Sequence, residues 1–232
     1  MSKHQPGCDM TRAETAFGWI YLFVMQLLPV PIAILLKLAG IHLDSTWMNV
    51  LFFTFNFLVI LLVFRRYLAG SFRTFGRHFL RTLALSTIGF AVYMSVNFVV
   101  SMAITINWPD FANANDSNIQ AMSQDHYWPL FIATVVLVPI TEETLFRGVV
   151  FGSLRKASPV IAYIFSCLIF SAIHVIPYVG KEGFTLTFAL VSLLQYLPAS
   201  LCLAWLYDKC NTIVAPALVH SAVNLVGMLM MR

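Results

Sequence analysis

Long apolar runs constrain this chain more than any other feature of its sequence. Of its 232 residues, 59% are hydrophobic and only 10% are charged, whereas a soluble domain carries about 25% charged residues. A membrane-spanning helix needs about 20 mostly apolar residues, and seven runs approach or reach that length. We therefore predict an all-α fold, a polytopic membrane bundle of about seven transmembrane helices. The predicted spans are roughly 17–39, 47–64, 82–106, 129–154, 159–178, 185–207 and 213–231.

The runs divide the chain into three parts. Residues 1–16 are predicted to form a short cytoplasmic tail, and residues 17–128 to form three N-terminal transmembrane helices with their loops. Residues 129–232 are predicted to form a core of four transmembrane helices that carries the candidate site. The first run is too long for a signal-peptide core, so we expect it to be retained.

Basic residues are distributed unevenly between the runs. The segment after the second run carries five arginines, whereas residues 107–128 carry three aspartates and no Lys or Arg. Because cytoplasmic loops are enriched in Lys and Arg, we predict that the N-terminus lies inside and the C-terminus outside. The small size and the lack of eukaryotic trafficking signals favour a bacterial plasma membrane. The five arginines are Arg65, Arg66, Arg73, Arg77 and Arg81.

The net charge and the cysteines exclude several classes of function. The net charge of +4 comes from residues between apolar runs, so it predicts contact with membrane lipid and no binding of nucleic acid. The four cysteines form no CxxC pair, and they predict neither a disulfide framework nor a zinc site. We expect no metal and no cofactor.

Ionisable groups inside the apolar runs mark the candidate site. Such groups are costly in a bilayer and by default indicate function. Only five lie deep in the predicted spans, and all five fall in the C-terminal half of the chain. They are Glu142, Glu143, Arg147, His174 and His220.

The spacing of these groups predicts which of them pair. Glu143 and Arg147 are four residues apart, so they share a helix face and should neutralise one another. Glu142 is rotated by about 100° from Glu143 and has no local partner. A carboxylate in an apolar site binds a proton more readily, so it can act as a base. His220 and Asn224 are also four residues apart, and both can donate hydrogen bonds.

Together these side chains provide the groups needed to hydrolyse an amide without a covalent intermediate. Glu142 and His174 can hold and deprotonate a water molecule, while the donors on His220 and Asn224 can stabilise an oxyanion. We expect the four side chains to face one polar pocket from three different helices. The sequence lacks the motifs of other proteases that could compete with this interpretation. It has no GxSG of the rhomboid type and no HExxH, and Tyr207-Asp208 has no GxGD partner to complete an aspartyl intramembrane protease site.

Other interpretations of the same residues remain open. Glu143 and Arg147 could form a purely structural ion pair, and His220 with Asn224 could only hydrogen-bond neighbouring helices. The chain could then be a non-catalytic membrane immunity or partner-binding protein. Alternatively, two glutamates and two histidines could bind a divalent cation in a metal- or proton-coupled transporter, although no inverted repeat is visible.

Three motifs resemble those of the CAAX protease and bacteriocin-processing family, also called the CPBP or Abi family. Residues 142–147 match its EExxxR motif, residues 170–174 its FxxxH motif, and residues 220–224 its HxxxN-type motif. The resemblance covers about residues 129–231, whereas the first three spans match no motif of the family.

The resemblance implies a glutamate-dependent intramembrane endopeptidase, a peptide hydrolase without a cofactor. By analogy with the family, Glu142 and His174 activate water, and His220 and Asn224 form the oxyanion site. Glu143 and Arg147 support them. The implied substrate is a membrane-embedded or membrane-associated peptide or protein. Prokaryotic members include bacteriocin-immunity and peptide-maturation proteins, so a prenylated substrate is not expected.

Overall fold

The computed structural model describes residues 9–181 and 183–232, and every regular element in these ranges is a helix. Residues 1–8 of the predicted tail lie outside the described residues. Three short segments (η1, η2 and η3) depart from α-helical geometry. The elements are α1 (Arg12–Leu27), α2 (Pro29–Leu38), α3 (Ser45–Val63), α4 (Arg65–Arg77), α5 (Phe79–Asn107), α6 (Ala114–Asp125), α7 (Tyr127–Ile132), η1 (Ala133–Leu137), α8 (Val138–Glu143), η2 (Thr144–Phe151), α9 (Gly152–Leu154), α10 (Pro159–Ile173), η3 (Ile176–Tyr178), α11 (Leu186–Cys210) and α12 (Val214–Met230).

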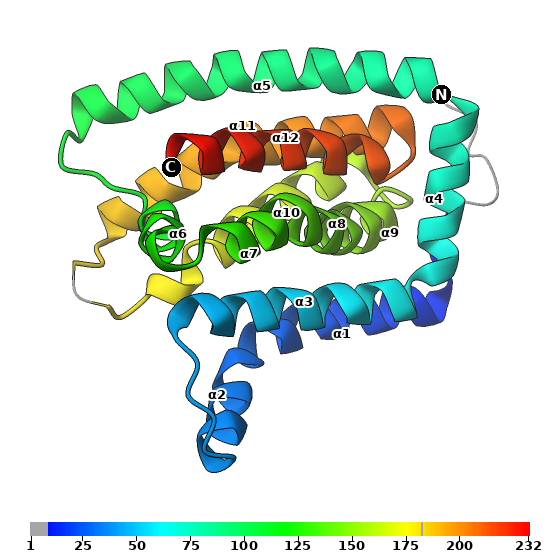
Figure 1. Cartoon of the computed structure of the whole chain (residues 1–232). Helices are drawn as coiled ribbons and strands as arrows, with labels where there is room; N and C mark the ends of the chain where they lie inside the picture. Colours follow the sequence, from blue (N-terminus) through cyan, green and yellow to red (C-terminus); the bar gives the residue numbers. More distant parts are fainter. Residues whose placement is uncertain (1–8, 182) are drawn as a thin grey trace.

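The long helices form a bundle in which most members run along a common direction (Figure 1). The bundle confirms the predicted all-α, polytopic fold. Five helices in the described residues are long and apolar enough to cross a membrane, or six if the bent pair α1 and α2 is one span. The seventh predicted run forms α12, which has only 17 residues. The count of seven and the orientation stay predictions.

The first predicted span is broken in the middle. A capping box begins α1, because Thr11 accepts a hydrogen bond from the backbone of Glu14 and the Glu14 side chain accepts one from the backbone of Thr11. The helix therefore starts at Arg12, inside the predicted tail. Pro29 occupies the first position of α2, and the two helices meet at a bend of 53°. A proline has no N–H to continue the ladder of α1, so the single helix predicted here was wrong.

The arginine-rich segment is a helix and not the loop that we predicted. Helix α4 buries Tyr67, Leu68 and Ser71 against the bundle, while its arginines remain exposed. It crosses one end of the bundle, at a steep angle to the long helices (Figure 1). This amphipathic pattern is typical of a helix that lies along a membrane surface.

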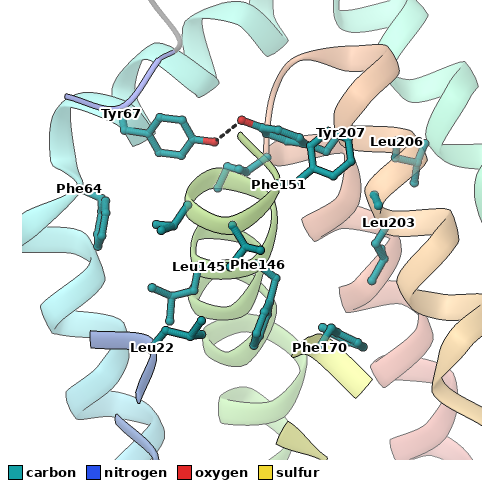
Figure 2. Close-up of a cluster of buried hydrophobic side chains, with 14 of the residues drawn as sticks. Leu22, Phe64, Tyr67, Leu145, Phe146, Phe151, Phe170, Leu203, Leu206 and Tyr207 are labelled. Carbon is teal, nitrogen blue, oxygen red and sulfur yellow. Dashed lines mark hydrogen bonds between the residues drawn. The ribbon is translucent and has the colours of Figure 1, made fainter. Parts of the chain in front are cut away.

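The segment Tyr127–Leu154, here called the central rod, comprises α7, η1, α8, η2 and α9. Its segments contact α1 and α3 on one side and α10, α11 and α12 on the other. Figure 2 shows the resulting core around η2, where side chains from the N-terminal helices and from α10 and α11 meet the rod. The Tyr67 hydroxyl donates a hydrogen bond of 3.1 Å to the Tyr207 hydroxyl across this core. The rod is therefore enclosed by protein along much of its length.

Candidate active site

Glu143 is the fully buried carboxylate of the central rod. Its Oε1 accepts a hydrogen bond of 3.3 Å from Nη1 of Arg147, so the predicted pairing within the helix is present. The same oxygen lies 2.9 Å from Nδ1 of His220 on α12. Because a carboxylate only accepts hydrogen bonds, Nδ1 of His220 carries the proton. Glu143 therefore joins α12 to the rod and fixes the orientation of the His220 ring.

Arg147 connects the rod to two further helices. Its Nη2 donates to the backbone oxygen of Ser200 on α11 at 3.1 Å. Its guanidinium lies over the ring of Phe170 on α10, 4.5 Å from the ring centre. The Arg147 side chain is fully buried, and a buried charge is tolerated only with such partners. The sequence pairing of Glu143 with Arg147 was correct but incomplete, because His220 and Ser200 also belong to this cluster.

Glu142 points to a different part of the same region. Its Oε2 lies 4.0 Å from Nε2 of His220, on the side of the ring opposite Glu143. This oxygen is buried and has no hydrogen-bond partner among the described residues. The carboxylate side chain is 13% exposed, in contrast to the fully buried Glu143. Two adjacent glutamates thus flank one imidazole: Glu143 hydrogen-bonds Nδ1, and Glu142 lies within ion-pair distance of Nε2 when the ring is doubly protonated.

Asn224 is held by a carbonyl that the rod leaves free. Within η1 the backbone follows π-helical hydrogen bonding, so the N–H of Val138 bonds the carbonyl of Ala133, five residues earlier. The next donor in this register would be residue 139 to the carbonyl of Thr134, but Pro139 has no N–H. Asn224 supplies the missing donor, with its Nδ2 2.9 Å from that carbonyl oxygen. One of its two amide hydrogens is therefore used, and the other is left for a ligand.

His174 lies at the end of its helix and not in the middle of it. It is the C-cap of α10, where its Nδ1 donates to the carbonyl of Phe170 at 2.8 Å. A carbonyl can only accept, so Nε2 is the ring nitrogen left for chemistry. The ring stacks on Tyr196 of α11 with ring centres 4.4 Å apart. Phe170 contacts both His174 and His220, with ring centres 4.9 and 6.0 Å away.

The structure thus gathers the predicted residues from three regions of the chain. Glu143 hydrogen-bonds His220, and Glu142 lies 4.0 Å from the same ring. Asn224 binds the rod, and Phe170 contacts both His174 and His220. A pocket shared by Glu142, His174, His220 and Asn224 stays a prediction. Within the described ranges, no group of three or more His, Cys, Asp or Glu side chains is arranged to hold a metal ion.

Sequence reasoning missed three residues that support the site. Ser200 and Tyr196 are four residues apart on one face of α11, and each contacts a member of the site. Polar residues at this spacing inside an apolar run were a signal that could have identified that face. Thr134 gave no such signal, because it acts through its backbone carbonyl.

Comparison with known proteins places the same region in a family. Residues 124–226 match the family model described as "Type II CAAX prenyl endopeptidase Rce1-like". The curated "UPF0177 protein YxdF" of Lactococcus lactis is 36% identical over 92 residues, which cover 40% of this chain and 44% of that protein. The chain therefore spans less than half of that relative's length. No solved structure matches the chain. Residues 124–226, which contain all three motifs, thus resemble the Rce1-like family of CAAX protease-like membrane proteins, and this match confirms the family resemblance that the motifs predicted.

Proposed function

We propose that this protein is an intramembrane endopeptidase that hydrolyses a peptide bond in a membrane-embedded or membrane-associated peptide or protein. The observation that carries the proposal is the position of Glu142. Its buried Oε2 has no hydrogen-bond partner among the described residues and lies 4.0 Å from Nε2 of His220. Oε2 of Glu143 also lacks a hydrogen bond, but its Oε1 is held by Arg147 and His220, and a purely structural carboxylate in this environment would be held in the same way. An unpaired one beside an imidazole is suited to bind and activate water.

In the proposed reaction, Glu142 accepts a proton from a water molecule as the water oxygen attacks the peptide carbonyl carbon. Nε2 of His174 orients the water, because Nδ1 of this ring is occupied by the Phe170 carbonyl. The proton passes to the leaving nitrogen as the C–N bond breaks, which yields a free amine and a carboxylate.

The oxyanion formed during attack receives hydrogen bonds from His220 and Asn224. Asn224 contributes the amide hydrogen that Thr134 does not use. His220 contributes from Nε2, which requires the doubly protonated ring, and its Nδ1–H remains bonded to Glu143. Glu143 and Arg147 take no part in proton transfer in this scheme. They position His220. Removing one hydrogen-bond donor from an oxyanion site typically lowers turnover by about 10²–10³-fold.

The test compares the two adjacent glutamates. Glu142→Gln keeps the size and hydrogen-bonding capacity of the side chain but removes the base. It should lower turnover of a fluorogenic membrane peptide by about 10²–10⁴-fold while the melting temperature stays that of the wild type. The matched variant Glu143→Gln should lower the melting temperature, because Arg147 loses its charged partner.

Unchanged cleavage by a well-folded Glu142→Gln protein would remove Glu142 as the base and sink the proposal. A protein that binds the peptide but never cleaves it, in wild-type or variant form, would instead favour a partner-binding or immunity role. In that case Glu142→Gln should be silent in the immunity or binding phenotype.

A further inference from the structure

A polar cavity lies close to the candidate active site. It has a volume of about 220 Å³ and is formed where the end of α5, the start of α6 and the middle of α11 meet. Figure 1 shows α6 at the end of the bundle opposite α4, near the C-terminus of α12. Six of the ten lining residues carry a hydroxyl or amide side chain, and Asp116 is the only charged residue among the ten. The lining residues used here are Ser101, Thr105, Asn113, Asp116, Gln120 and Gln195.

The carboxylate of Asp116 lacks a cationic partner. It forms no ion pair with any Lys or Arg of the described residues, and the whole segment 107–128 contains neither residue type. Asp116 is exposed, yet the protein around its carboxyl removes enough water to raise the pKa, while a hydrogen bond with Asn115 and the charge of His174 lower this pKa. A bound cation would offset that desolvation.

The local role of Asp116 does not explain the cavity. Asp116 lies in the first turn of α6, where a negative charge favours the helix dipole. The side-chain oxygen of Asn113 already caps this turn by accepting from the backbone of Asn115 and Asp116. Capping therefore accounts for an acidic residue at this position. It does not account for the hydrogen-bonding groups of α5 and α11 that line the same cavity.

A short chain of contacts links the cavity wall to His174. Asn113 donates from Nδ2 to the side-chain oxygen of Gln195 at 2.8 Å. The Tyr196 hydroxyl donates to Oδ1 of Asn113 at 3.2 Å, and the Tyr196 ring stacks on His174. The cavity is thus separated from His174 by the side chain of Tyr196. A peptide that extends from His174 past Tyr196 would reach this cavity.

We propose that this cavity is a subsite that binds a basic side chain, Lys or Arg, of the peptide substrate. The inference rests on the proposed function, since it assigns one specificity determinant to that site. Asp116 supplies the countercharge, and the surrounding hydroxyl and amide oxygens accept the remaining hydrogen bonds of an ammonium or guanidinium group.

The first experiment measures binding without relying on cleavage. The probe is an acetylated, amidated Ala/Leu peptide that carries one Lys at the interfacial end of its apolar stretch, and the control peptide has norleucine there. Binding is measured to the Glu142→Gln protein in nanodiscs, with mass spectrometry to verify that the peptide stays intact. We expect the Lys peptide to bind about tenfold more tightly than the norleucine peptide.

Two aspartates of the same segment then serve as matched variants in the Glu142→Gln background. Asp116→Asn should abolish the preference for Lys, whereas Asp110→Asn, at an exposed residue that does not line the cavity, should keep it. Equal losses of the preference in both variants would show only a general charge effect and would overturn the proposal. Equal affinity of the parent Glu142→Gln protein for the two peptides would overturn it as well. If Asp116→Asn melts early, Thr105→Lys gives a second test, because a cation placed in the wall should also abolish the preference.

The wild-type protein separates this inference from the proposed function. If it binds the Lys peptide through Asp116 but cleaves no peptide, the proposed function fails and the subsite stands. If it cleaves both peptides with equal kcat/KM, and Asp116→Asn does not change that ratio, the subsite fails and the proposed function stands.

Discussion

The central rod and α5 are similar in length and apolar character but differ in their surroundings. Both exceed the length needed to cross a membrane, with 28 and 29 residues. In the most apolar stretch of the rod, 44% of the residues are buried, compared with 17% in α5. The rod carries Glu142, Glu143 and Arg147, whereas the only charged residue of α5 is the exposed Arg81 at its start.

The difference shows which side chains are buried in a membrane helix bundle. Helix α5 directs large side chains such as Phe98 and Val99 outward and buries small or polar residues, among them Ser86 and Gly89. Lipid is as apolar as leucine, so helices gain by close backbone approach and hydrogen bonding, and large apolar residues need not face inward. The rod is covered on several sides, and only such a helix can hold charged groups away from lipid.

The largest effect is expected from removing the buried charge of the rod. Arg147→Met leaves Glu143 without its cationic partner and should lower the free energy of unfolding by about 3–5 kcal/mol. The control is Arg81→Met, which removes an exposed guanidinium that donates to the Lys209 carbonyl and should cost less than about 0.5 kcal/mol. Both are measured by denaturant unfolding in detergent. Adding Glu143→Gln to Arg147→Met should recover part of the loss, and no recovery would argue against the ion pair.

A slightly smaller effect should follow from truncating an aromatic side chain of the rod. Phe146 is fully buried against Phe170, and Phe146→Ala should cost about 3 kcal/mol. This is the lower end of the range, because lost packing dominates when lipid is the alternative solvent. Phe98→Ala on α5, where the side chain is 63% exposed, should change stability little. Comparable losses at the two positions would contradict the assignment of α5 to the lipid boundary.

An intermediate loss of stability is expected from adding a methyl group to glycines that contact the rod or lie on α5. A Cβ on Gly18 would clash with the buried side chain of Val149 on the rod, whereas a Cβ on Gly89 of α5 would lie 3.1 Å from the flexible end of Leu206. Overpacking a tight contact costs about 1–3 kcal/mol, so Gly18→Ala should destabilise more than Gly89→Ala. Thermal melting measures both variants. Adding Val149→Ala should relieve Gly18→Ala, and failure to do so would locate the strain elsewhere.

The smallest effect concerns the backbone of the rod. If Pro139 leaves the Thr134 carbonyl to Asn224, then Asn224→Ala should cost about 1 kcal/mol in the wild type. In a Pro139→Ala background the restored N–H can bond that carbonyl, so Asn224→Ala should cost almost nothing. A double-mutant cycle of unfolding free energies measures this coupling. Additive effects would show that the two residues act independently.

The sequence by itself indicated that the helices lie in a lipid bilayer, and it also indicated the fold class and the candidate residues. Apolar runs exclude a soluble domain, and a charge inside such a run is costly enough to stand out without any structure. Spacing along one helix correctly predicted the pairing of Glu143 with Arg147, because residues four apart share a helix face. The three motifs also predicted the family whose model matches residues 124–226.

Only the tertiary structure decided which groups meet across helices. Spacing within one helix says nothing about its rotation relative to another, so it did not predict that His220 bonds Glu143 and lies 4.0 Å from Glu142. The π-helical η1 and the free carbonyl at Thr134 depend on how the rod is packed around Pro139, and hydropathy does not record a change in helical register. We did not predict the bend between α1 and α2 or the helix α4. The apolar content of a segment indicates whether it lies in lipid, but it does not indicate the direction in which the helix runs.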